Sequence, residues 1–301
     1  MSPLSFAAGD VLMREGEPGD YFLLLTSGEV DVEIRGRHVA VAGPGAVVGE
    51  LAVVSGHPRS ATVTARTEVS ALAGDAEAFE ALLAVPGEYE RLVKLVSLRL
   101  AEDVRPVPAT LPDGTAVRLR PLVPNDRAAY TDAVRGLSPT SLHRRFFTGG
   151  QPSQGTIDRL LEVSYTEHFA LVAVADHAGE PLGVGRFIRL RRDPTTADLA
   201  FGIRDAHQGR GIGTLLLGAL GAAAPAAGVR TFTADVLHEN AAMRRVLDKA
   251  GARFRREEPG VVHTAFPADA AAALLEPALA SAVEEAAHDI VTAAGLALIG
   301  P

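Results

Sequence analysis

The 301-residue chain contains no cysteine and no tryptophan, and lysine occurs only as Lys94 and Lys249. Without cysteine the protein forms neither a disulfide nor a cysteine nucleophile. The sequence also lacks a basic-then-apolar leader and any apolar run long enough to span a bilayer, so we expect a cytoplasmic protein with no membrane partner. Its formal net charge of −8 argues against nucleic acid as a partner.

The chain does have enough apolar material for two cores. Hydrophobic residues make up 47% of the sequence, and its length favours two domains. Pro106, Pro108 and Pro112 break helices and stiffen the chain, which predicts a linker over residues 104–116. Short strands with glycine turns and then a helix over residues 88–103 precede this linker. The predicted parts are therefore domains over 1–103 and 117–268, with a helical segment over 269–301 that either packs on the second domain or acts as a switch.

A glycine-rich loop over residues 208–213 lies between a strand-like segment, residues 199–203, and a helix-like segment, residues 214–224. Gly209, Gly211 and Gly213 leave backbone N–H groups uncovered, and the N-terminus of the following helix adds positive dipole. Together these features predict a cradle for a pyrophosphate group.

Other glycine loops fit this segment poorly. The dinucleotide fingerprint requires a third glycine where this chain has Leu216, and a P-loop requires a Gly-Lys-Ser/Thr sequence that is missing. The spacing Gln-x-x-Gly-x-Gly instead resembles the acetyl-CoA loop of the GNAT acetyltransferases. The resemblance implies acetyl-CoA as co-substrate, bound by Ala200, Phe201, Gly202, Ile203, Gln208, Gly209, Arg210, Gly211, Ile212, Gly213 and Asn240.

Asp198 lies on the strand that enters this loop, where many GNAT enzymes carry a glutamate that acts as general base. An amine nucleophile must lose a proton before it attacks a thioester, because lysine at neutral pH is almost wholly ammonium. Aspartate is one methylene shorter than glutamate, which favours a bridging water over direct abstraction. The alternative is a surface acid on an edge strand.

Asn240 follows a strand-like segment, residues 231–237, and precedes a helix, residues 241–250. In GNAT domains this asparagine caps the helix and often touches the coenzyme A arm; a pure helix cap is the alternative. Many members carry a tyrosine seven residues later that acts as general acid for the leaving thiolate. Position 247 is leucine here, so the thiolate must leave with water or another donor.

Residues 138–147 resemble a segment of bacterial protein acetyltransferases. Arg144 and Arg145 in this segment either orient an acidic partner surface or have a solvated or structural role. His143 and His168 are isolated, so both are interpreted as structural, and we expect no metal because no His/Asp cluster has ligand spacing.

The first domain carries a second candidate site. Residues 45–52 place Glu50 at the start of a short helix, and Arg59 follows nine residues later. A ribose hydroxyl donates to a carboxylate, and a phosphate favours a guanidinium. With residues 15–30, this pattern resembles the phosphate-binding cassette and β-roll turns of cyclic-nucleotide-binding domains. The resemblance implies a cyclic-nucleotide site formed by Gly49, Glu50, Leu51, Ala52, Arg59, Ser60 and Arg99.

Within that resemblance, Glu50 would bind the ribose hydroxyl and Arg59 the phosphate, and serine at position 60 favours cAMP over cGMP. Arg99 either stacks on the purine or is an ordinary exposed helix arginine. A β-roll that has lost its ligand is the alternative.

The order of the two domains resembles the cAMP-regulated protein lysine acetyltransferases of actinobacteria. The resemblance implies an α+β chain, with an N-terminal β-roll and a C-terminal mixed α/β GNAT domain. It also implies acetyl transfer to lysines of other proteins, such as acetyl-CoA synthetase and other acyl-adenylate-forming enzymes, or a universal stress protein. Two alternatives remain: a cyclic-nucleotide receptor with an inactive acetyltransferase scaffold, and an enzyme that acetylates a small amine.

Overall fold

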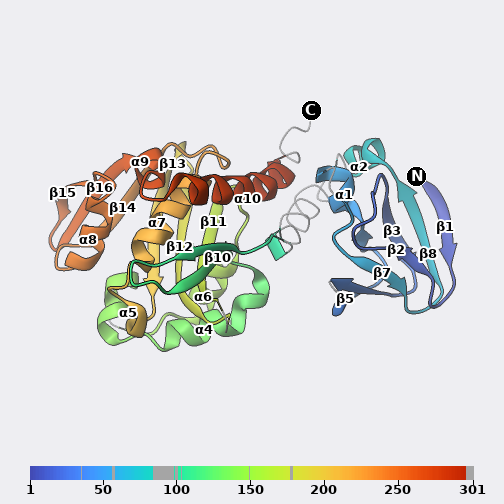
Figure 1. Ribbon diagram of the computed structural model, residues 1–301, viewed down its shortest axis with the longest axis horizontal. Helices are drawn as coiled ribbons and strands as arrows, with labels where there is room; N and C mark the ends of the chain where they lie inside the picture. The colour runs from blue at the N-terminus through green and yellow to red at the C-terminus, as the bar shows by residue number, and fades with distance from the viewer. Residues whose placement is uncertain are drawn as a thin grey trace. The chain divides into compact units, whose positions relative to one another are not determined.

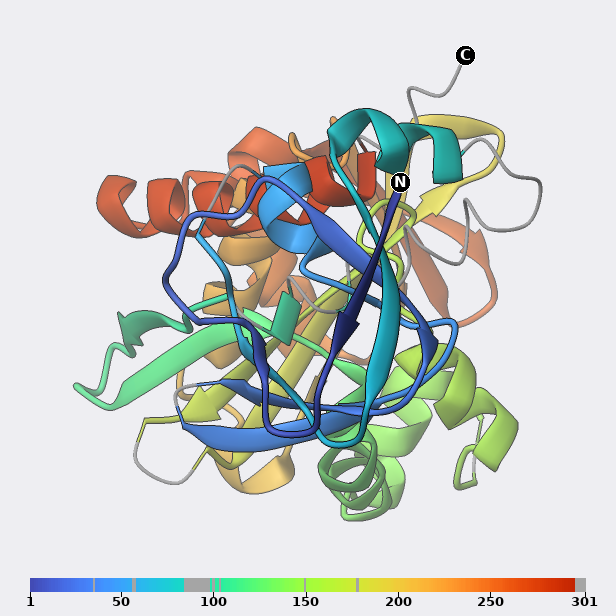
Figure 2. The ribbon, with the colours of Figure 1, turned by 90° about the vertical axis from the view of Figure 1, so that its right-hand side faces the viewer.

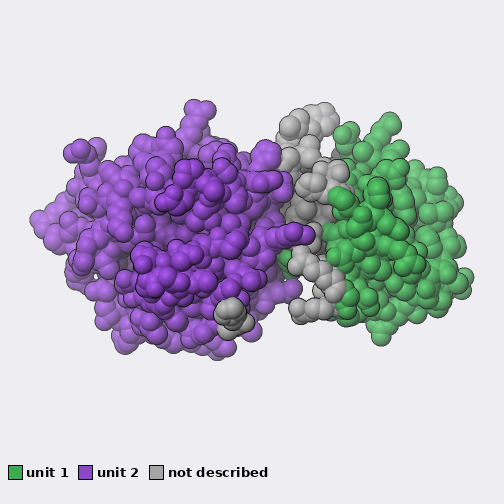
Figure 3. Space-filling view, in the orientation of Figure 1, with its two compact units in different colours: residues 1–103, 293–301 green, residues 104–292 purple. Residues whose placement is uncertain are grey.

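The computed structural model describes residues 1–34, 36–55, 58–83, 98, 101–102, 104–148, 150–176 and 179–295. The chain forms two compact units: unit 1 comprises Met1–Asp103 with Ala293–Pro301, and unit 2 comprises Val104–Thr292 (Figure 3). Each unit has its own sheet structure and core. Among the described residues, no helix has the length and apolar character needed to cross a membrane.

Unit 1 is a roll of two antiparallel four-stranded sheets (Figure 2). Its elements are β1 (Ser2–Phe6), β2 (Val11–Met13), β3 (Phe22–Ser27), β4 (Val30–Ile34), β5 (Arg37–Ala42), β6 (Val47–Val48), α1 (Glu50–Ser55), β7 (Thr62–Ala65), β8 (Val69–Gly74) and α2 (Ala76–Leu83). The strand orders are β1-β8-β3-β6 and β2-β7-β4-β5. Leu23 and Val69 of the first sheet and Val30 and Val63 of the second are buried in one shared core. The helix expected over residues 88–103 lies almost entirely outside the described residues.

Unit 2 contains one eight-stranded sheet with helices on both faces (Figure 1). Its strands are β9 (Val107–Thr110), β10 (Ala116–Pro121), β11 (His168–Ala175), β12 (Pro181–Leu190), β13 (Asp193–Ile203), β14 (Thr231–Leu237), β15 (Arg253–Glu258) and β16 (Val261–Pro267). Its helices are η1 (Pro124–Asp126), α4 (Arg127–Arg135), α5 (Pro139–Phe146), α6 (Gln154–Leu161), η2 (Asp205–His207), α7 (Ile212–Ala223), α8 (Ala241–Asp248), α9 (Ala268–Ala272) and α10 (Pro277–Gly295).

The strand order is β15-β16-β14-β13-β12-β11-β10-β9, and only the β13–β14 pair is parallel. The strand β11 is buried almost throughout its length, since both faces of the sheet are covered. The helix α7 packs closely on β12 because that strand carries glycines: a Cβ at Gly185 would lie 3.2 Å from Leu216 Cβ, and one at Gly183 would lie 3.3 Å from Ile212 Cγ2.

The proline-rich residues 104–116 differ from the linker that the sequence suggests. They contain β9, which pairs with β10 in unit 2. Pro108 is compatible with this strand because β9 lies at the edge of the sheet, where a missing N–H group leaves no neighbouring carbonyl unpaired. The β9–β10 hairpin therefore belongs to the sheet of unit 2.

Candidate active site and effector site

A cleft opens where β13 and β14 separate. These strands pair only over residues 196–198 and 231–233, whereas β13 stays paired with β12 as far as Ile203. Beyond Asp198 the two strands border a cavity of about 1040 Å³ that residues of α5, α7 and α8 also line. This volume slightly exceeds the range typical for small-molecule sites, which is about 300–1,000 Å³.

The glycine loop lies along this cavity. Gly209 and Gly211 have φ angles of +76° and +98°, a left-handed conformation that glycine adopts without steric cost. Gly211 is the N-cap of α7 and offers no side-chain cap, so the N–H groups of the first turn can bind an anion. The cavity is lined by all the residues predicted to bind the cofactor: Ala200, Phe201, Gly202, Ile203, Gln208, Gly209, Arg210, Gly211, Ile212, Gly213 and Asn240.

Asp205 fixes the start of the loop against the N-terminus of α5. Its carboxylate accepts hydrogen bonds from Ser138 N at 2.6 Å, from the Ser141 hydroxyl and from Gln208 Nε2 at 2.9 Å. The Gln208 amide also donates to the Ile203 carbonyl at 3.1 Å. The glutamine of the motif therefore positions the loop through hydrogen bonds to its own chain.

Arg210 fixes the middle of the loop against the tip of the β9–β10 hairpin. Its Nε donates to Asp113 Oδ2 at 2.8 Å and its Nη2 donates to Thr115 Oγ1 at 2.6 Å. Hydrogen bonds from Thr115 and Arg210 lower the pKa of Asp113 to about 2. A Cβ at Gly211 would lie 2.7 Å from Pro112 Cδ, so the hairpin tip packs directly on the glycine loop.

Asp198 lines the same cavity, at the point where the strands separate. Burial, followed by the negative charge of Asp235, raises its pKa to about 6, while Arg145 and His263 oppose the rise. A carboxylate with this pKa is mostly ionised at pH 7 and is a better proton acceptor than an exposed aspartate.

Asn240 both caps α8 and lines the cavity. Its side chain accepts a hydrogen bond from Met243 N at 3.2 Å, and the residue is among the cavity-lining group. Leu247, at the position where the family resemblance led us to look for a tyrosine, is fully buried and is not among the described residues that line the cavity. Its side chain offers no proton to a leaving thiolate.

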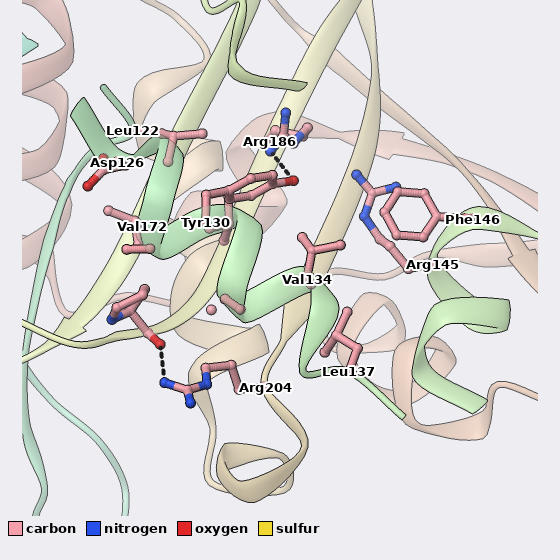
Figure 4. A pocket seen from close by; sticks show the side chains of 16 residues that line it. Leu122, Asp126, Tyr130, Val134, Leu137, Arg145, Phe146, Val172, Arg186 and Arg204 are labelled. Atoms are coloured by element: carbon pink, nitrogen blue, oxygen red, sulfur yellow. Dashed lines mark hydrogen bonds between the residues drawn. The ribbon is translucent and has the colours of Figure 1, made fainter. Parts of the chain in front are cut away.

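The two arginines of α5 also line the cavity. Burial lowers the pKa of Arg145, while Tyr130 and Asp198 oppose the fall, and its guanidinium lies 5.1 Å from the ring centroid of Phe146. Within the described part of the chain, the buried Nε of Arg144 has no hydrogen-bond partner. Arg145 also borders a second, smaller cavity of about 40 Å³ beside α4 (Figure 4).

Arg186 is one of the polar residues that line this smaller cavity. It is 1% exposed and donates to the Tyr130 hydroxyl at 3.0 Å (Figure 4). Burial and the Arg186 charge lower the pKa of His168 to about 4, so His168 is neutral and its Nε2 faces Arg186 Nη1 at 3.1 Å. These contacts support the structural interpretation of His168.

The candidate effector site in unit 1 centres on Arg59, which is 5% exposed. Its Nη1 donates to the carbonyls of Tyr21 and Gly49 at 2.7 Å each, and its guanidinium lies 4.6 Å from the Tyr21 ring centroid. A Cβ at Gly49 would lie 2.6 Å from Arg59 Nη1, and the φ of Gly49 is +81°, so this position favours glycine on two grounds.

Glu50 begins α1 and is fully buried. Ala52 is buried in the same helix, which also contains Leu51, while Ser60 next to Arg59 is partly buried. Arg99 lies outside the described residues. The structure thus joins Arg59 to Gly49 by a hydrogen bond, and Arg59 Nη2 is buried without a hydrogen-bond partner among the described residues.

Several charged or titratable residues near the cleft escaped the sequence interpretation, His207 among them. Asp235, Arg245 and Lys249 line the cavity, and Nδ1 of His263 lies 2.8 Å from Asp235 Oδ1. Asp235 could have been identified from the sequence, because it occupies an outward-facing position of the alternating strand that precedes Asn240. His263 could not have been identified in this way, because only the pairing of β14 with β16 brings it to Asp235.

Family models of known domains match both units. The cyclic nucleotide-binding domain matches residues 3–85, and the acetyltransferase (GNAT) domain matches residues 116–253. The chain is 36% identical over 304 residues to acetyltransferase Pat of Mycolicibacterium smegmatis, covering 97% of this chain and 90% of that relative. The chain belongs to the Pat family of acetyltransferases.

Solved structures of Pat proteins agree with this assignment. The cAMP-binding acyltransferase from Mycobacterium smegmatis superposes with a TM-score of 0.53 at 33% identity, covering 97% of this chain and 89% of that one. The GNAT domain of S. lividans PAT superposes with a TM-score of 0.51 at 30% identity, covering 54% of this chain and 96% of that domain. The predicted α+β fold with a cyclic-nucleotide-binding module, the acyltransferase activity and acetyl-CoA as co-substrate are therefore confirmed.

Proposed function

We propose that this protein is a cAMP-regulated protein lysine N6-acetyltransferase that works in the cytoplasm, with residues 1–103 as its sensor and residues 117–268 as its catalytic domain. The observation that carries the proposal is Asp198, a carboxylate with a pKa of about 6, in the cleft that the glycine loop lines. The cleft has places for both an acetyl thioester and a base that accepts the proton of an amine.

The residues of the cleft have separate roles in binding and catalysis. The N–H groups of the glycine loop and of the first turn of α7 bind the pyrophosphate of acetyl-CoA. Asn240 contacts the coenzyme A arm, and residues 200–203 on β13 lie along it. Asp198 accepts the proton of the lysine ammonium, directly or across one water, so that the free amine attacks the acetyl carbon.

The residues around Arg59 fit a cyclic nucleotide monophosphate. A phosphate oxygen would give the buried Arg59 Nη2 the acceptor that it lacks among the described residues, and a charge-assisted bond of this type is stronger than a neutral one. Glu50 would accept the ribose hydroxyl, and Gly49, Leu51, Ala52 and Ser60 would line the pocket. The relative described as a cAMP-binding acyltransferase supports cAMP as the nucleotide.

For the acceptor we propose a lysine on another protein, such as acetyl-CoA synthetase, another acyl-adenylate-forming enzyme or a universal stress protein. This rests on the Pat family to which the chain belongs. Addition of cAMP should change the rate of acetyl transfer, either upward or downward.

The experiment is acetyl transfer to purified acetyl-CoA synthetase with and without cAMP, measured by mass spectrometry of its lysines over pH 5.5–9. Wild-type activity should rise through pH 6 as Asp198 ionises, and Asp198→Asn should lower turnover about 10²–10⁴-fold with little change in acetyl-CoA affinity. Activity confined to small amines, or no transfer while cAMP still binds, would contradict the proposal. A loss below threefold in Asp198→Asn would assign the base to another group.

A further inference from the structure

Three strands place a row of polar side chains beside the cleft. Asp198 of β13 pairs with Thr233 of β14, and Asp235 of β14 pairs with His263 of β16. Residues that pair across strands share a face, and side chains two residues apart on one strand also share a face. Asp198, Asp235 and His263 therefore lie on the same face of the sheet, on consecutive strands.

The row runs from the partly buried Asp198 toward solvent. Asp198 and Asp235 both line the cleft. The Asp235 side chain is 60% exposed, and its Oδ1 lies 2.8 Å from Nδ1 of His263, whose side chain is 29% exposed. Asp235 thus has contact with bulk water while one of its oxygens is held in place.

The reaction produces a proton that must leave this region. A proton passes from the lysine ammonium to an Asp198 oxygen, and the amine lone pair forms the C–N bond. The C–S bond then breaks with its electron pair on the coenzyme A sulfur, and the second proton lost from the nitrogen passes through water to that sulfur. Asp198 is then protonated, and it must lose that proton before the next turnover. The burial of Asp198 and then the like charge of Asp235 both favour the protonated form of Asp198.

We propose that Asp235 is the proton exit of the active site: it receives the proton from Asp198 through an intervening water and releases it to solvent, and His263 is a positioning residue that holds the Asp235 carboxylate. This inference rests on the proposed role of Asp198 as the base. His263 Nδ1–H donates to Asp235 Oδ1, which leaves the second carboxylate oxygen for the proton.

Charged groups on the other elements around Asp198 do not serve this purpose. Arg145 of α5 opposes the rise in the pKa of Asp198. Arg144 of α5, Arg245 of α8 and Lys249 directly after α8 supply cations to the cleft. An arginine or a lysine is already fully protonated at neutral pH, so it accepts no proton from a carboxylic acid. Among the described residues that line this cavity with Asp198, the other carboxylates are Asp235 and Asp113, and Asp113 on the β9–β10 hairpin binds Arg210. His207 of η2 also lines the cavity, but its Nδ1 lies 3.4 Å from Arg210 Nη1, within the contacts of the glycine loop.

The first test follows the ionisation of Asp198 without measuring activity. The ¹³Cγ shifts of aspartates in the full-length chain are titrated in wild type and in Asp235→Asn, with Asp198→Asn to assign the signal. Removal of the neighbouring charge should lower the Asp198 pKa from about 6, while Glu239→Gln, which removes an exposed charge from the loop after β14, should leave it unchanged. An unaltered Asp198 titration in Asp235→Asn would overturn the inference.

The second test measures proton transfer by chemical rescue of the full-length chain with acetyl-CoA, cAMP and acetyl-CoA synthetase. At low buffer concentration Asp235→Asn should lose about tenfold or more in kcat, less than the 10²–10⁴-fold of the base itself, with an unchanged KM for acetyl-CoA. Added imidazole should restore kcat in Asp235→Asn and leave wild type and Glu239→Gln unaffected. Loss of kcat without rescue, or no loss, would overturn the inference.

The His263 variants separate positioning from folding. His263→Asn can still donate from the position of Nδ1 and should keep most of kcat, whereas His263→Phe should lose kcat and recover it with imidazole. Equal loss in both variants would overturn the positioning role. A wild-type chain that transfers no acetyl group would contradict the proposed function instead, since the ¹³C titration does not depend on turnover.

Discussion

A carboxylate that takes a proton from an ammonium group works best when its own pKa lies near the working pH. Asp198 reaches this condition through burial and a neighbouring acid, because each makes its charged form less favourable. The same two causes make the ionised side chain a source of instability in the folded protein. Activity and stability therefore oppose each other at this residue.

Asp198→Asn should stabilise the protein at neutral pH. The pKa of Asp198 is raised from 3.8 to about 6 in the folded state, which corresponds to a cost of up to about 3 kcal/mol for the ionised form. The raised pKa of Asp198 therefore contributes stability that is fully present below about pH 4 and is lost as the pH rises through about 6. The Tm of Asp198→Asn should exceed that of wild type at pH 7.5, and the difference should shrink toward pH 4.

A difference in Tm that stays constant from pH 4 to pH 7.5 would contradict this interpretation. Asp176→Asn, on the same domain outside the cleft, is the control for loss of a carboxylate.

Arg59→Lys should raise the cAMP concentration needed for a response without changing the rate at saturation. Lysine keeps the charge but loses the planar group that donates to the Tyr21 and Gly49 carbonyls and stacks on the Tyr21 ring. Loss of one charge-assisted hydrogen bond, about 1.5–3 kcal/mol, predicts a weakening of about 10–150-fold in Kd. Calorimetric titration with cAMP measures the Kd of Arg59→Lys and of wild type.

Arg66→Lys is the matched control, since Arg66 lies in the same unit with a half-exposed side chain. Equal cAMP affinities in the two variants would show that Arg59 does not bind the phosphate.

At the scale of elements, α7 and its N-terminal loop depend on close packing. The helix is buried on nearly all sides, and the loop before it is held by Asp205 on one side and by the β9–β10 hairpin on the other. The anion cradle is therefore held in place by side chains distant in sequence.

Gly211→Glu should abolish acetyl-CoA binding while cAMP binding stays intact. A side chain here meets Pro112 within 2.7 Å and brings a negative charge to the pyrophosphate path, at a φ of +98°. Gly228→Glu is the control, because Gly228 also has a positive φ of +70° but open space around it. Calorimetry that shows normal coenzyme A affinity in Gly211→Glu would refute the assignment of this loop.

The elements of the active site could be predicted from local sequence, but their contacts could not. The strand expected over residues 231–237 is β14, and the helix expected over 241–250 is α8 (Ala241–Asp248), because alternation and an asparagine cap are local signals. The pairing of Asp113 with Arg210 joins residues 97 positions apart. Nothing within either segment encodes that contact, since it depends on how the hairpin packs on the loop.

At the scale of the whole chain, the hairpin that contacts the glycine loop begins directly after unit 1 in the sequence. Because the hairpin also holds Arg210 of the glycine loop, it is a route by which a cyclic nucleotide can act on acetyl transfer. A ligand shifts an equilibrium only through different affinities for two states, so a regulated enzyme must have two states that also differ in their affinity for acetyl-CoA or for the protein substrate.

If the two sites are coupled, the effect must be reciprocal. Acetyl-CoA or the protein substrate should then change the affinity for cAMP by the same factor by which cAMP changes theirs, about 5–150-fold for a coupling of 1–3 kcal/mol. Calorimetry in both orders of addition measures the two factors. Identical activity of the full chain and of residues 105–301, with no effect of cAMP on the former, would show that the units act independently.

The separation of β13 from β14 also determines what kind of molecule can complete the sheet. Past Asp198, β13 is paired with β12 on one side only, so alternate peptide groups of residues 199–203 face the cavity. An extended molecule with amides of its own can lie there as a guest strand, and the pantetheine arm of coenzyme A is such a molecule. Hydrogen–deuterium exchange at these amides should therefore slow when coenzyme A binds. An acetyl thioester of a short thiol without amides should be a poor donor, although it carries the same reactive group.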